Sequence, residues 1–168
     1  MIIETYKING WEDEETGILL YENDDWILVK HIPIDYQIDG YKIYCKKWID
    51  ARKSGLKEKQ IKHVLKLKNV DSAIPSGLKL DNTHSILNQI EKKLGLVEFQ
   101  DSDSDDLFYA KNINIHGDEF SIDMVDSKGV LEKCYDYRFS FNEIRSIAFK
   151  SDYFESIVLL ISNPFEDT

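Results

Sequence analysis

The sequence contains the same hairpin pattern twice. In residues 19–28, two alternating apolar positions precede a polar stretch and two more follow it, and residues 113–122 repeat this arrangement 94 positions later. Asn23 and Gly117, which lie in the two polar stretches, tolerate the backbone angles that a short hairpin turn requires. The pattern therefore predicts two pairs of antiparallel strands, each joined by a tight turn.

A further apolar stretch follows each hairpin, in residues 41–49 and 137–144, and a short polar segment closes each unit. Each unit then comprises a hairpin, a third strand and a short closing strand. A segment of about 50 residues is too small for a β-sandwich and suits a compact, curled sheet. We interpret the repetition as an internal duplication.

The two hairpins differ in the cover that they need. Residues 18–21 and 26–29 are apolar without interruption, so both faces of the first hairpin should be buried. Residues 113–124 alternate between apolar and polar side chains, so the second hairpin should bury one face and expose the other.

Two helices are predicted between the units. Residues 56–68 place apolar side chains at helical spacing, with lysines largely on the other side. Residues 83–94 form a second apolar stripe, preceded by the capping residue Asn82 and followed by Gly95. We expect a buried strand at residues 154–161.

Together these elements predict an α+β, mainly β fold, in which two small, strongly curled antiparallel sheets are linked by one or two helices. The predicted domains are a first β unit with a basic helix at 1–70, a connector with a helix at 71–100, and a second β unit at 101–168. Apolar residues make up 42% of the chain, which is enough for a folded core.

The composition indicates a cytoplasmic protein. Two cysteines are too few for a disulfide framework, and no basic-then-apolar leader opens the sequence. The longest wholly apolar run, residues 157–161, is far shorter than the roughly 20 residues of a spanning helix. We therefore expect no membrane insertion.

The net charge of −10 is unevenly distributed along the chain. Residues 1–40 hold ten acids and two lysines, residues 41–80 hold three acids and eleven basic residues, and residues 81–168 hold eighteen acids and eight basic residues. An acidic field favours a basic partner, whereas the middle segment has the charge that a nucleic-acid binder uses.

Familiar catalytic and metal-binding patterns are missing from the sequence. The acidic run 101–106 begins like a calcium loop but has Asp106 where that loop needs glycine, so we expect a solvated acidic loop and no metal. His31 with Asp35 and Asp39 could form a small proton-transfer cluster. We predict no cofactor and no enzymatic activity, with an unrecognised hydrolase as a weaker alternative.

The basic middle segment carries the alternative function, a small-barrel RNA-binding protein that uses residues 41–68. Lysines interleave with aromatic residues there, and this is the composition of a face that contacts phosphates and stacks on bases. The nucleic-acid-binding residues of this alternative would be Lys42, Tyr44, Lys46, Lys47, Trp48, Arg52 and Lys53.

The stretch from Trp26 to Tyr44, with the related stretch from Phe120 to Phe141, resembles a group of uncharacterised bacterial proteins that contain tandem Sm-like or SH3-like small β-barrels. In these proteins a hairpin precedes an acidic loop and a strand with a closing motif, which here is 143–147. The resemblance implies a fold but no activity.

We predict a non-enzymatic protein-binding module, such as an immunity-type protein, that binds a basic protein partner through an acidic surface. Aromatic side chains would anchor the partner, and a strand edge could pair two copies of the chain. The partner-binding residues would be Trp11, Glu12, Asp13, Glu14, Glu15, Tyr21 and Tyr36.

Overall fold

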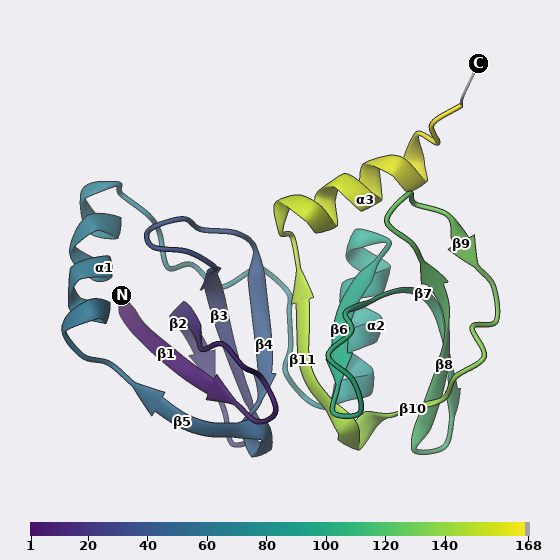
Figure 1. The fold of residues 1–168 in the computed structure, drawn as a ribbon, viewed down its shortest axis with the longest axis horizontal. Helices are drawn as coiled ribbons and strands as arrows, with labels where there is room; N and C mark the ends of the chain where they lie inside the picture. The colour runs from purple at the N-terminus through teal and green to yellow at the C-terminus, as the bar shows by residue number, and fades with distance from the viewer. Residues whose placement is uncertain (167–168) are drawn as a thin grey trace. The chain divides into compact units, whose positions relative to one another are not determined.

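The computed structural model describes residues 1–166 and divides into two compact units, residues 1–77 and 78–168. Each unit contains an antiparallel sheet and at least one helix (Figure 1). The first unit has nearly balanced charge, with thirteen acids and twelve basic residues. The second has eighteen acids and nine basic residues, a net charge of −9.

The sheet of the first unit has five strands in the order β5-β1-β2-β3-β4. The hairpin predicted from residues 19–28 is present, because β2 and β3 pair across the turn at 23–25. The elements are β1 (Ile2–Ile8), β2 (Glu15–Glu22), β3 (Trp26–Ile32), β4 (Tyr41–Cys45), the 3-10 helix η1 (Lys46–Trp48), β5 (Ile49–Lys53) and α1 (Leu56–Leu67).

Both faces of the first sheet are buried along β3, as the apolar run 26–29 predicts, whereas in β2 Leu19 and Leu20 are half-buried and Tyr21 is exposed. The α1 helix lies along β1 and buries Ile61 and Leu65 against Ile3, Ile18 and Ile32 (Figure 1). The opposite face carries a second buried cluster, with Trp11 and Trp48 packed at its margin. Its buried members are Tyr6, Ile8, Ile27, Val29 and Tyr44.

The second unit repeats this strand order. Its sheet runs β11-β6-β7-β8-β10, with the two-residue strand β9 also paired to β8. The second predicted hairpin is β7–β8. The elements are α2 (Thr83–Leu94), β6 (Val97–Asp101), β7 (Phe108–His116), β8 (Glu119–Val125), β9 (Leu131–Glu132), β10 (Phe139–Ser140), the 3-10 helix η2 (Phe141–Glu143), β11 (Ile144–Phe149) and α3 (Asp152–Ser162).

A cluster of aromatic rings forms the core of the second unit. Phe99, fully buried on β6, has ring centroids of Phe108, Phe120 and Phe139 at 5.5, 5.5 and 4.9 Å. The predicted helix at 83–94 is confirmed in its bounds and its capping: Asn82 accepts a hydrogen bond from the Ser85 N–H, and Gly95 has a left-handed backbone. Apolar side chains of α2 are buried, and the helix contacts β6, β7 and β11.

The prediction of two small, strongly curled barrels is wrong. All strand pairs within the units are antiparallel, but no pairing among the described residues joins β5 to β4 or β10 to β11, so neither sheet closes on itself. Helices provide the cover that closure would provide in a barrel. The fold class is therefore α+β, mainly β, with open antiparallel sheets and three α-helices in the described chain.

The buried strand expected at 154–161 is also wrong, because this segment belongs to α3. Ser151 caps the helix by accepting a hydrogen bond from the Phe154 N–H, and Asp152 and Glu155 lie in its first turn, where negative charge favours the helix dipole. Phe154 and Ile157, one turn apart, are its buried residues. None of the helices in residues 1–166 has the length and apolar character needed to cross a bilayer.

Candidate binding site

Four consecutive acids line a hollow of about 570 Å³ in the first unit. They are residues 12–15, at the entry to β2, and Thr16 follows them. His31, Ile32 and Pro33 at the end of β3 and Lys57 of α1 complete the lining. The structure thus brings together four of the predicted partner-binding residues, because the loop after β1 and the end of β3 meet there.

The acids that line the hollow differ in their ion-pair partners. The Glu12 and Asp13 side chains are exposed and make no hydrogen bond or ion pair with the residues that the structure describes. Glu14 pairs with Lys53 at 2.6 Å. Lys7 donates hydrogen bonds to the backbone carbonyls of Trp11 and Glu12, which holds the loop in place while leaving both of those carboxylates available.

Glu15 is the centre of a half-buried polar network. A single oxygen, Glu15 Oε2, lies 2.8 Å from His31 Nε2 and accepts hydrogen bonds from Lys42 Nζ at 2.7 Å and the Tyr44 hydroxyl at 3.1 Å. Burial works against ionisation of Glu15, but the hydrogen bond from His31 and the charge of Lys42 outweigh it and lower the pKa of Glu15 to about 2. The network therefore keeps Glu15 ionised and pairs its charge with Lys42.

Strand register brings this network together. His31 on β3 lies opposite Gly17 on β2, two residues after Glu15, so both side chains point to the same face. Lys42 and Tyr44 on β4 lie opposite Val29 and Ile27, which share that face. Burial and the nearby Glu15 charge also raise the pKa of the Tyr44 hydroxyl, which therefore stays a donor.

Gly17 is required by the close approach of β3. A Cβ atom at this position would lie 2.7 Å from Val29 Cβ, well inside van der Waals contact. We expect Gly17→Ala to lower the free energy of unfolding by about 2 kcal/mol, the usual cost of overpacking a core. Gly55→Ala, whose Cβ would meet Glu58 at an ordinary 3.6 Å, should cost less than about 1 kcal/mol. Equal losses in urea denaturation would contradict this assignment.

The three predicted aromatic anchors do not form one patch. Trp11 is half-buried near the hollow, where its ring packs edge-on against Tyr44 and lies under Lys42 Nζ at 5.4 Å. Tyr21 is exposed at the other end of β2, opposite Leu28. Tyr36 packs against the cluster that α1 covers, and its hydroxyl accepts a hydrogen bond from Gln60. Trp11 is thus the one aromatic residue of the three that borders the acids.

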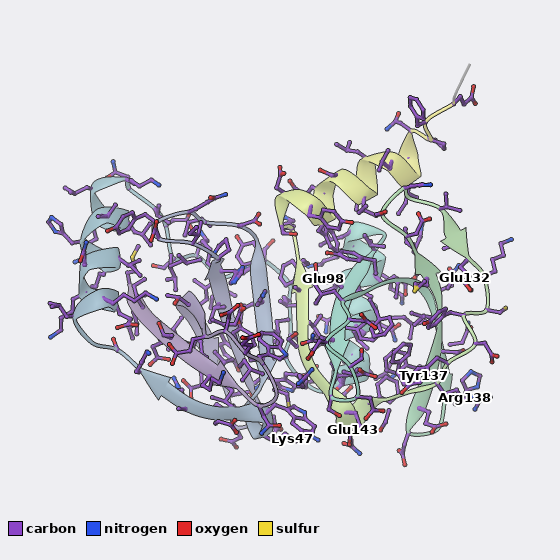
Figure 2. All side chains as sticks on the ribbon, in the orientation of Figure 1. Lys47, Glu98, Glu132, Tyr137, Arg138 and Glu143 are labelled. Atoms are coloured by element: carbon purple, nitrogen blue, oxygen red, sulfur yellow. The ribbon has the colours of Figure 1, made fainter. Side chains whose placement is uncertain are left out.

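The structure pairs most cations of the nucleic-acid alternative with carboxylates of the same unit. Lys42 pairs with Glu15 and Lys53 with Glu14, whereas Lys46 and Arg52 both pair with Glu22. Tyr44 is fully buried and offers no ring for base stacking. Lys47, labelled in Figure 2, lies over the Trp48 ring, with Nζ 5.1 Å from its centroid. Lys42, Lys46, Arg52 and Lys53 therefore balance acids in the first unit.

The acidic run 101–106 in the second unit is fastened by a buried arginine. Arg145 on β11 donates hydrogen bonds to the backbone carbonyls of Asp101 and Ser104 at 3.0 and 2.8 Å. Its Nη2 also lies 3.7 Å from Asp105 Oδ1. Within residues 1–166, no three His, Cys, Asp or Glu side chains are placed to hold a metal ion.

The sequence did not suggest the partner that His31 has in the structure, where its Nε2 lies 2.8 Å from Glu15 Oε2. Thr16, Pro33 and Lys57 also line the hollow and were not predicted. Counting along the hairpin could have placed Thr16 beside the end of β3.

Known proteins add nothing to this geometry: no family model, no curated protein and no solved structure matches the chain.

Proposed function

We propose that this chain is a non-enzymatic protein-binding module that receives a cationic segment of its partner in the hollow lined by residues 12–15. The observation that carries the proposal is the pair of exposed carboxylates, Glu12 and Asp13, which line the hollow together with the half-buried Glu15. A lysine or arginine side chain entering there would meet two carboxylates without an ion-pair partner among the described residues, Glu12 and Asp13, next to Glu15, whose charge is paired with Lys42. An immunity-type protein that neutralises a basic toxin is one protein of this kind.

The hollow is suited to recognition because its charges are held in place. Lys7 fixes the backbone of the acidic loop, and His31 and Lys42 fix the Glu15 side chain, so neither the loop backbone nor Glu15 has to be ordered on binding. The second unit adds a net charge of −9, which would accelerate the approach of a basic partner. Trp11 beside the acids provides an apolar contact for the stem of the bound side chain.

The RNA-binding alternative has less support at the residues that suggested it. Four of its five cations have carboxylate partners, and its central aromatic residue, Tyr44, is buried. A phosphate backbone would have to displace those carboxylates, at the cost of each ion pair.

We also propose a reducing compartment, the cytoplasm, for this protein, because the two cysteines, Cys45 and Cys134, are free.

A labelled hexa-arginine peptide tests the hollow by fluorescence anisotropy. We expect the peptide to bind at low ionic strength, and Glu12→Lys combined with Asp13→Lys to weaken binding about tenfold or more, because two attractions become repulsions. The matched control is Asp24→Lys combined with Asp25→Lys, an exposed pair in the β2–β3 turn with the same change in charge.

The comparison between the two double variants decides the proposal. If the control pair weakens binding as strongly, the peptide senses net charge and not the hollow. If wild-type protein does not bind the peptide at all, the proposed function fails. Far-UV circular dichroism of both variants checks that the fold is retained.

A further inference from the structure

One side of α1 carries basic side chains that no acid of the first unit pairs with. Lys59, Lys62 and Lys66 are spaced by three and four residues, and His63 lies four residues after Lys59 and three before Lys66, so the four form a single stripe along the helix. None of the four side chains makes an ion pair or hydrogen bond with any described residue. We call these four residues the α1 stripe.

Charge pairing in the first unit therefore separates two groups of cations. On β4, η1 and β5, Lys42, Lys46, Arg52 and Lys53 are paired with acids at 2.6–2.7 Å. On the helix, the α1 stripe remains unpaired. The unit is nearly neutral in sum, yet this helix presents an excess of positive charge to solvent.

Two exposed leucines share the side of the helix that carries the stripe. Leu56 and Leu67, at the two ends of α1, are 83% and 70% exposed, and their positions flank His63 on the helical face opposite the buried residues Ile61 and Leu65. A phosphate backbone offers no apolar surface to such side chains. A protein that combines acidic and aliphatic groups on its surface matches this face better.

The second unit of the same protein has this chemistry. It carries a net charge of −9 and exposes aliphatic side chains, including Leu107 and Val130, which are 53% and 59% exposed. We propose that the α1 stripe docks onto the acidic second unit of a second copy of the chain. The two surfaces differ, so the contact is heterologous, and each bound copy leaves another stripe and another acidic unit available.

Sedimentation equilibrium over a wide range of protein concentration tests this association. At about 0.01 M ionic strength, where charges act over about 30 Å, we expect the average mass to rise above the 19.6 kDa of one chain and to keep rising with concentration. At about 1 M ionic strength, where charges act over about 3 Å, the mass should return to that of one chain.

Charge-reversal variants distinguish an effect of the α1 stripe from an effect of the net charge of the chain. Changing Lys59, Lys62 and Lys66 to Glu should keep the protein at the mass of one chain, whereas changing them to Arg should preserve the association. The matched control changes Lys92, Lys128 and Lys133, exposed in the second unit, to Glu, and it should still associate.

Three results would overturn the proposal. The first is a wild-type mass of one chain at every concentration and ionic strength. The second is an association that the three Lys→Glu changes in the stripe leave intact. The third is that single-stranded RNA binds the wild-type chain but not the variant with the three Lys→Glu changes, while the wild-type mass stays that of one chain. That result would assign the α1 stripe to nucleic-acid binding. None of these results depends on whether the hollow binds hexa-arginine.

Discussion

Glu15→Gln should lower the free energy of unfolding by about 3 kcal/mol at neutral pH. The lowered pKa of Glu15, about 2 compared with 4.5 in the unfolded chain, corresponds to roughly this amount of native-state stabilisation of the charged form. The substitution also leaves the half-buried Lys42 without its charged partner. Glu14→Gln, which removes an exposed ion pair with Lys53, should cost less than about 1 kcal/mol.

The pH dependence gives this prediction a second readout. Because the pKa of Glu15 is lower in the folded chain, its contribution is complete above about pH 4.5 and is lost as the pH falls toward 2. In urea denaturation at several pH values, the free energy of unfolding should therefore fall less steeply with decreasing pH in Glu15→Gln than in the wild type. The proposed role of Glu15 would be contradicted if Glu15→Gln kept the wild-type pH dependence of stability, or if it lost no more stability than Glu14→Gln.

Phe99→Ala should lower the free energy of unfolding by about 4 kcal/mol. Phe99 is fully buried, and three other phenylalanine rings lie within 5.5 Å of its centroid, so truncation leaves a cavity that the sheet cannot easily fill. Denaturation followed by circular dichroism measures the loss.

Two further substitutions serve as controls for the stability loss expected of Phe99→Ala. Phe99→Leu should cost less than Phe99→Ala, because it removes less volume. Phe165→Ala, at a side chain that is 81% exposed, should change stability by no more than about 0.5 kcal/mol. Similar losses for Phe99→Ala and Phe165→Ala would mean that the ring cluster is not the core of the second unit.

Local signals in the sequence were sufficient for the hairpins and for two helices. The α2 helix combines a regular apolar stripe with Asn82 at one end and Gly95 at the other, and both capping residues perform the expected roles. The α3 helix lacks such contrast, since Val158, Leu159, Leu160 and Ile161 form an unbroken apolar run. Periodicity cannot distinguish a buried strand from a helix in a run of this kind.

The network around Glu15 could not be predicted, because it depends on an irregularity in strand register. The pairing of β2 with β3 shifts by one residue between Leu19 and Tyr21. Without that bulge, counting back from the turn would place His31 opposite Ile18, on the other face from Glu15. A one-residue shift in register thus decides which side chains line the hollow, and no residue in the sequence indicates this shift.

The tryptophans offer a practical means of studying the two halves of the chain. All three, Trp11, Trp26 and Trp48, lie within residues 1–77, and two of them flank the buried cluster of Tyr6 and Tyr44. Tryptophan emission, excited where tyrosine does not absorb, therefore reports on residues 1–77 without any added fluorophore. A difference between the unfolding midpoints measured by this emission and by circular dichroism would reveal whether the two halves unfold in separate steps.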